Sequence, residues 1–267
     1  MEITKNKEGV SLKKHIVSLD KTLVSLAKKN GYDLSNHKAV VVVELDHSGS
    51  MKPLYKNGSV QNFLTRLMPI ALKFDDNKEL DVLIYSDDFK QIEPITLNNF
   101  DNYVENIIKE DDYHYGGTQF APVLEYTLSK YFGVGVGNYD VLKQVNKDLL
   151  SRVISKLSFL TKKDKFQTSV PDDMPIYVMF LTDGYNSDMD RTCNLIKLSS
   201  KYHMFIQIIG IGDLDLCNFK KLSTVGGRMH NNTDFFKMDT LNSLTDEELY
   251  NKLMLNYSKW LKEINLI

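Results

Sequence analysis

The chain has few cysteines and no excess of charge of one sign. Cys193 and Cys217 are the only cysteines among its 267 residues. Two are too few for a disulfide framework or a thiolate metal site, and the sequence leaves open whether they are free or bridged. The 33 Lys and Arg residues stand against 35 Asp and Glu, for a formal net charge of −2. This balance gives no reason to expect a nucleic-acid or anionic-membrane partner.

Long hydrophobic runs are also lacking. No apolar run reaches the roughly 18 residues needed to cross a bilayer. The longest, at 39–45 and 176–182, have the length of a strand. The N-terminal residues MEITKNKEGVSLKK contain no apolar core of the kind that a secretory signal needs. We therefore expect a cytoplasmic protein without membrane insertion.

Strand and helix patterns alternate along the chain. Apolar, often β-branched runs predict strands at 39–45, 80–85, 89–95, 175–181, 204–209 and 235–238. Apolar residues three and four apart predict helices at 11–29, 60–74, 103–109, 121–131 and 190–201. The second and third strands should form a hairpin, and the polar residues 47–59 are interpreted as a loop. The alternation is typical of an α/β fold with a mostly parallel sheet.

The two ends and one internal segment complete the predicted organisation. Thr245 and Glu248 match a capping box, which predicts a C-terminal helix over 245–264. The helix at 11–29 either belongs to the main fold or forms an arm with the rest of residues 1–37. Residues 133–171 break the alternation, although 141–160 look helical. We interpret them as a surface insertion in a single domain that spans 1–267.

Oxygen-bearing side chains follow the first buried strand. Asp46-His47-Ser48-Gly49-Ser50 places one carboxylate and two hydroxyls at alternate positions. A small loop can turn these three groups toward one point, and oxygen ligands suit a hard divalent cation. The pattern is short enough to arise by chance, and a turn in which Asp46 and Ser48 bond the backbone is the alternative.

Two further segments supply oxygen ligands at corresponding places. Gly116-Gly117-Thr118 offers a hydroxyl in a loop before a helix, and Asp183 follows another buried strand. In open α/β sheets, ligands bind outside the carboxyl ends of the strands. Three such segments in this order favour a binding site over three unrelated turns.

This set of residues resembles the metal-ion-dependent adhesion site of von Willebrand factor A (VWA) domains. The surrounding segments HKAVVVVELDHSGSM, GGTQFAPVLE and VMFLTDGYNSD are similar to VWA proteins of the tellurium-resistance (TerF-like) family. The resemblance covers almost the whole chain but fails over 133–171. It implies a doubly wound, six-stranded, mostly parallel sheet with helices on both faces.

The resemblance also implies a ligand set and a function. Ser48, Ser50 and Thr118 would contact Mg²⁺ or Mn²⁺ through their hydroxyls, and Asp46 and Asp183 directly or through water. His47 is expected to pack near the strand end, because imidazole is a softer ligand than such a site requires. The bound ion would capture an exposed Asp or Glu of a partner protein, in a tellurite, stress-response or phage-related system.

Two other functions stay open. A Mg²⁺-dependent phosphohydrolase of a doubly wound fold also places an Asp after a buried strand. Such enzymes normally need a second acid two residues later, where this chain has Ser48. An adaptor with a vestigial metal site is the third interpretation, and it predicts no metal binding. We expect a binding module that is not an enzyme.

Overall fold

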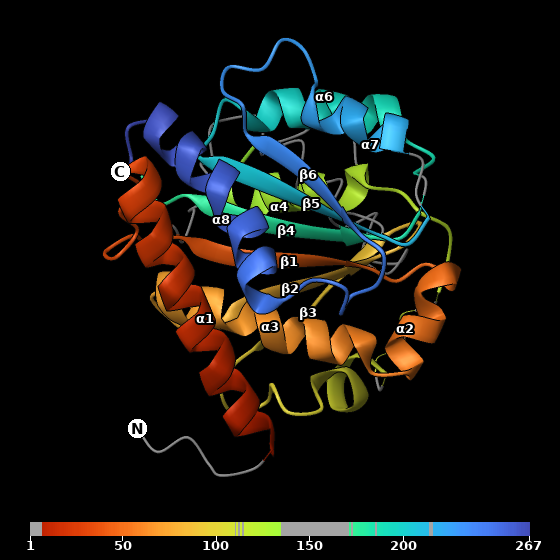
Figure 1. Ribbon diagram of the computed structural model, residues 1–267. Coiled ribbons are helices and arrows are strands. Elements are labelled where there is room, and N and C mark those ends of the chain that lie inside the picture. Colours follow the sequence, from red (N-terminus) through yellow and green to blue (C-terminus); the bar gives the residue numbers. More distant parts are fainter. Residues whose placement is uncertain are drawn as a thin grey trace.

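The computed structural model describes residues 7–109, 111, 113, 115–134, 171, 173–184, 186–213 and 216–267. Its centre is a six-stranded sheet with strand order β3-β2-β1-β4-β5-β6 (Figure 1). The strands are β1 (Val40–Asp46), β2 (Leu80–Tyr85), β3 (Phe89–Ile95), β4 (Ile176–Thr182), β5 (Met204–Ile211) and β6 (Thr233–Met238). Neighbouring strands are parallel except β2 and β3, which form the expected antiparallel hairpin.

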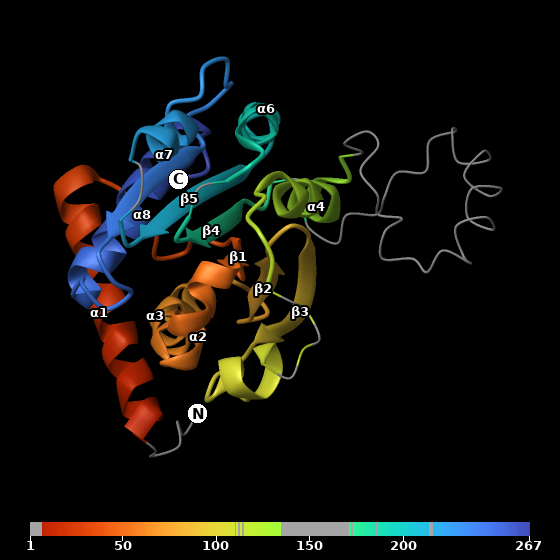
Figure 2. The ribbon, with the colours of Figure 1, turned by 90° about the vertical axis from the view of Figure 1, so that its right-hand side faces the viewer.

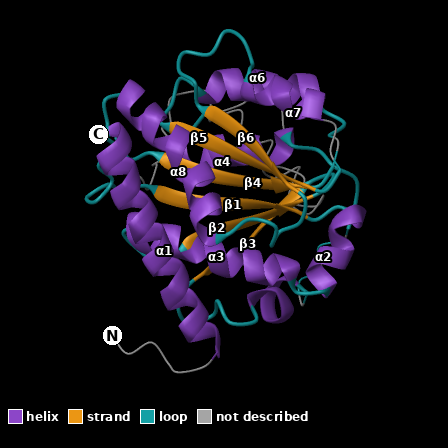
Figure 3. Ribbon diagram, viewed as in Figure 1, coloured by secondary structure: helices purple, strands orange, loops and turns teal. Residues whose placement is uncertain are grey.

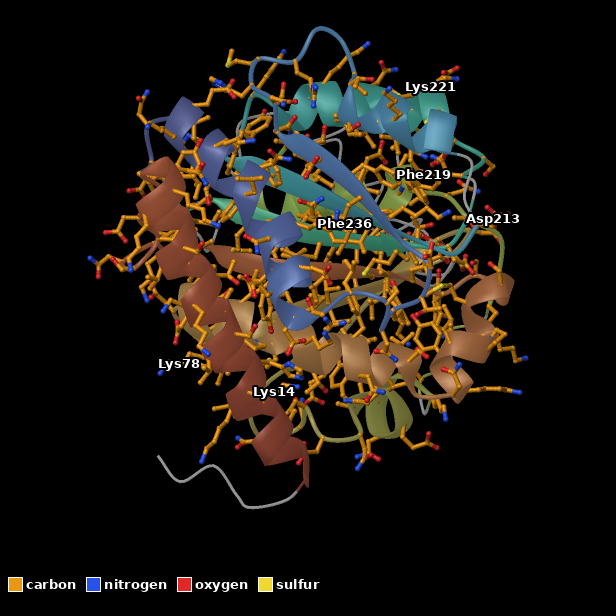
Figure 4. The ribbon with its side chains drawn as sticks, viewed as in Figure 1. Lys14, Lys78, Asp213, Phe219, Lys221 and Phe236 are labelled. Atoms are coloured by element: carbon orange, nitrogen blue, oxygen red, sulfur yellow. The ribbon has the colours of Figure 1, made fainter. Side chains whose placement is uncertain are left out.

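Helices cover both faces of this sheet, as the doubly wound α/β prediction requires (Figures 2 and 3). The helices of the described residues are α1 (Lys7–Asn30), α2 (Lys52–Lys56), α3 (Ser59–Phe74), α4 (Ala121–Phe132), α6 (Met189–Ser199), α7 (Leu216–Ser223) and α8 (Asp246–Glu263). Helices α1, α3 and α8 pack on one face and α4, α6 and α7 on the other. Phe236 of β6 and Phe219 of α7 belong to these two separate layers (Figure 4).

The terminal helices follow the apolar patterns seen in the sequence. Leu19, Leu23 and Leu26 of α1 are at most 6% exposed and lie in the same core cluster as α8. Helix α1 thus packs on the main fold. Both halves of the capping box are present at the start of α8, where Thr245 accepts from the Glu248 amide and Glu248 accepts from the Thr245 amide. This confirms the predicted start of the C-terminal helix.

Three local predictions were wrong or incomplete. The expected loop after β1 contains a short 3₁₀ helix, Gly49–Met51, followed by α2, because Met51 and Tyr55 bury their side chains there. The helix expected at 103–109 is a π-helical turn, Val104–Ile108. Helix α7 was not predicted, since its eight residues carry only a short apolar pattern. The helix expected at 141–160 lies outside the described residues.

One acid lies inside the sheet's core. Glu44 of β1 is fully buried, and the Thr127 hydroxyl of α4 donates to its Oε1 at 2.5 Å. Burial raises the pKa of Glu44 to about 8, so this side chain is largely neutral at pH 7.

Among the described helices, none combines the length and apolar character needed to cross a membrane.

Candidate metal site

The sheet brings the ends of β1 and β4 side by side. These strands are parallel neighbours, with Leu45 opposite Leu181. Asp46 is the last residue of β1, and Asp183 comes directly after β4. The carboxyl ends of β1 and β4, where Asp46 and Asp183 stand, therefore lie at the same edge of the sheet. The arrowheads of β1 and β4 mark this edge in Figure 1. We call this edge the carboxyl edge, and it is where a parallel α/β sheet binds ligands.

Four of the five predicted ligands form one hydrogen-bonded line. The Ser48 amide donates to Asp46 Oδ1 at 2.8 Å. The Ser48 and Ser50 hydroxyls are 3.1 Å apart, and Ser50 Oγ donates to Asp183 Oδ1 at 2.8 Å. The structure therefore brings together side chains that are up to 137 residues apart by number, from Asp46 to Asp183.

Thr118 reaches the same place from a third segment. Its Oγ1 lies 3.9 Å from the position that a Cβ atom would occupy on Gly184, the residue after Asp183. Ser48 forms an isolated parallel bridge with Gly116, and the Gly49 amide donates to the Gly116 carbonyl at 3.1 Å. All three segments that carry oxygen ligands in the sequence are thus adjacent in space.

Burial sets the charge state of the two carboxylates. Asp46 is fully buried, and this raises its pKa to about 6, although hydrogen bonds from Ser48 and Thr182 oppose the shift. Burial also raises the pKa of the half-buried Asp183, against the hydrogen bond from Ser50. A buried carboxylate is unfavourable unless it is protonated, well hydrogen-bonded or beside a cation. The oxygen-only donor set fits a hard divalent cation on these grounds.

The site depends on hydroxyl groups. Within the described part of the chain, no three His, Cys, Asp or Glu side chains gather as a potential metal cluster. The predicted ligand set therefore consists of two carboxylates, Asp46 and Asp183, and the hydroxyls of Ser48, Ser50 and Thr118. Another carboxylate, Asp213, lies two residues after the end of β5, and its side chain is fully exposed (Figure 4).

His47 packs in an aromatic cluster beside the site. Its ring stacks on Tyr115 with centroids 4.0 Å apart and meets the Tyr55 ring edge-on at 4.9 Å. Burial lowers the pKa of His47 to about 4, and among the described residues its Nδ1 has no hydrogen-bond partner. The packing role expected for His47 matches this geometry. The Tyr113 ring also lies near His47, with centroids 5.7 Å apart. The sequence analysis did not identify this tyrosine cluster, although Tyr115 directly precedes the Gly-Gly-Thr segment and Tyr113 lies two residues earlier.

Comparison with known proteins places the chain in a family. The family model described as "vWA found in TerF C terminus" matches residues 38–132 and 163–266. The uncharacterized protein YcbR of Bacillus subtilis (strain 168) is 31% identical over 232 residues, which cover 86% of this chain and 80% of YcbR. The family model's match omits residues 133–162, which lie within the predicted insertion.

Solved structures show the same fold at low identity. Proximal thread matrix protein 1 from the mussel byssus is 12% identical with a TM-score of 0.50, and covers 82% of this chain and 47% of its own. A second structure of that protein has a zinc-occupied MIDAS (metal-ion-dependent adhesion site) motif. It is 13% identical with a TM-score of 0.50, and the match covers 83% of this chain and 46% of the mussel protein. The chain thus spans about half the length of the mussel protein. Together with the family match, these findings identify the chain as a member of the vWA-TerF-like family, with a VWA fold.

Proposed function

We propose that this protein is a metal-dependent protein-binding module. One Mg²⁺ or Mn²⁺ ion would be held by Asp46, Ser48, Ser50, Thr118 and Asp183, with the aspartates acting directly or through water. The observation that carries this proposal is the hydrogen-bonded line from Asp46 to Asp183 at the carboxyl edge. Further support comes from the mussel protein of the same fold, whose MIDAS motif holds zinc.

The ligand set determines what kind of partner the ion would bind. Hydroxyls are neutral, so the two aspartates are the only anions in the set, and an aspartate that acts through water offsets less of the ion's charge. The ion then favours an anionic ligand from outside, and a partner protein supplies this as Asp or Glu. A single such contact covers little area, so the surrounding loops must add affinity. The resemblance of the sequence to the tellurium-resistance family adds a role in tellurite resistance, stress response or a phage-related system to the proposal.

Catalysis is disfavoured by two features of the site. Ser48 stands where a phosphohydrolase of this type would carry its second acid. The imidazole of His47, the residue after Asp46, is 3% exposed and packs against the rings of Tyr55 and Tyr115, which is a structural role and not that of an accessible base. We therefore propose binding without turnover.

Isothermal titration with Mg²⁺ tests the metal step. The native chain should show one site, which Asp46→Ala abolishes and Ser50→Ala weakens. Ser50 is exposed, so its variant does not threaten the fold. Asp213→Ala is the matched control, because it removes an exposed carboxylate that also follows a strand. Binding that is equal in all four proteins would place the metal elsewhere.

Affinity capture from the native cell tests the partner step. A partner should be retained with Mg²⁺, released by chelator and retained less by Thr118→Ala. Asp213→Ala should retain it fully. A partner that is insensitive to both chelator and Thr118→Ala would bind another surface, and the proposed function would fail.

A further inference from the structure

The loop that carries Thr118, residues 116–120, is attached to the β2–β3 hairpin. Asp87 lies in the hairpin turn and is exposed. Its Oδ2 accepts a hydrogen bond from the Gly117 amide at 2.8 Å. In the same region, the Gln119 amide donates to the Ser86 carbonyl at 2.8 Å. Asp88, the next residue, instead accepts from the Phe89 amide within its own turn.

The two glycines of the loop make room for this carboxylate. A Cβ atom on Gly116 would lie 2.5 Å from Asp87 Oδ2, and one on Gly117 would lie 2.4 Å from Asp87 Oδ1. Neither glycine has a positive φ, so the backbone conformation does not call for glycine at these positions. An added Cβ atom at either glycine would therefore displace the Asp87 carboxylate from the position in which it accepts from the Gly117 amide.

A second carboxylate holds the other end of the same loop. Asp188 accepts from the amides of Phe120 and Ala121 at 3.0 and 2.9 Å. It stands at the N-terminus of α6, but its side chain caps α4. The Ser187 amide also donates to the Thr118 carbonyl at 3.0 Å. Thr118 is therefore flanked by backbone groups that neighbouring loops hold in place.

We propose that Asp87 is a positioning residue of the metal site. It fixes the Gly116–Gly117 backbone, so that the Thr118 hydroxyl is held beside Gly184, the residue after Asp183, before any ion arrives. This inference rests on the proposed function, since Asp87 would affect metal binding by positioning the proposed ligand Thr118. Residues that orient metal ligands in this way typically change metal affinity by about 10- to 100-fold when they are replaced.

Mg²⁺ titration of three variants separates positioning from simple charge. Asp87→Ala should weaken Mg²⁺ binding about tenfold. Asp87→Asn keeps an oxygen that can accept from Gly117 while it removes the charge, and should retain most of the affinity. Asp88→Ala removes a neighbouring charge without touching the loop and should bind as the native chain does. Equal weakening in all three variants would show a charge effect and overturn the proposal, as would unchanged binding by Asp87→Ala.

The glycine pair provides an independent arm. Gly117→Ala should weaken Mg²⁺ binding, because its methyl group meets the Asp87 carboxylate. In the Asp87→Ala background the same change should add little, since the clash is gone. Fully additive losses would mean that Gly117 acts through something other than Asp87.

Hydrogen exchange without metal keeps the inference separate from the proposed function. Asp87→Ala should speed amide exchange in residues 116–120 of the metal-free protein, whereas Asp87→Asn and Asp88→Ala should not. If the native chain binds no Mg²⁺, the proposed function fails, and with it the metal role of Asp87, even if exchange still shows the tether. If the native chain binds Mg²⁺ but exchange and affinity are unaffected by Asp87→Ala, the inference alone fails.

Discussion

His37 gives the fold a dependence on pH that a single substitution can isolate. Its side chain is 8% exposed, its Nε2 lies 2.7 Å from the Tyr257 hydroxyl, and the Phe74 ring meets it edge-on with centroids 5.4 Å apart. Burial lowers the pKa of His37 from 6.5 to about 4. The folded protein therefore holds this imidazole neutral at pH values where the unfolded chain protonates it.

The sign and size of the effect follow from these two pKa values. Above pH 6.5 the side chain is neutral in both states and contributes no pH dependence. Between pH 6.5 and 4 the unfolded state binds more protons, so the free energy of unfolding falls as the pH falls, and the loss levels off below pH 4. The full shift corresponds to about 3 kcal/mol, of which about 2.5 kcal/mol should be lost by pH 4.5.

Urea unfolding at pH 7.5 and 4.5 measures this loss. His37→Gln does not titrate and can still form a hydrogen bond with Tyr257, so its free energy of unfolding should fall about 2.5 kcal/mol less than that of the native chain. Asp75 shifts in the opposite sense, with a pKa raised to about 6 mainly by burial. Both proteins contain Asp75, so their difference isolates His37. Equal losses in the two proteins would refute the buried, neutral histidine.

Three further outcomes are expected. Thr245→Ala removes the hydroxyl that accepts from the Glu248 amide, and should lower the free energy of unfolding by about 1 kcal/mol, as read by urea unfolding beside the exposed control Thr240→Ala. Replacing residues 135–170 by a short Gly/Ser linker should leave thermal unfolding cooperative, and a large fall in the melting temperature would show that the segment supports the core. The native chain should not hydrolyse a general phosphatase substrate, and metal-dependent turnover that Asp46→Asn abolishes would contradict a pure binding role.

Much of the fold was predictable because its central strands are buried on both faces and consist mostly of apolar residues. All seven positions of β4 and all eight of β5 are buried, and both strands are mostly apolar, with Thr182 at the end of β4 and Gln207 inside β5 as polar exceptions. The ends of such strands are easy to find, and Asp46 and Asp183 lie directly at two of them. The capping box at Thr245 was equally clear, since its two partners are three residues apart.

The remaining features depend on contacts between distant segments. The approach of Asp87 to Gly117 requires the hairpin turn to lie against a loop 30 residues later, which no local pattern reveals. The stacking of His47 on Tyr115 also joins two segments that are distant in the sequence, so no local pattern predicts it. Tyr55 of α2 is buried, and its hydroxyl donates to the Asp46 carbonyl at 2.9 Å, a contact that the polar sequence around it does not reveal. That the five predicted ligands hold a metal ion remains a prediction.

Helix α4 ends and strand β4 begins at the end of the sheet opposite to the carboxyl edge. Phe132, the last residue of α4, packs against Tyr202, two residues before β5, and Pro175 immediately precedes β4. The seven residues of β4 place roughly 20 Å between that point and Asp183. The described ends of α4 and β4 and the predicted ligands thus lie at opposite ends of the sheet. Under the proposed function, a fluorescent reporter joined beside Phe132 or Pro175 would start at the end of the sheet away from the residues that are expected to meet the partner.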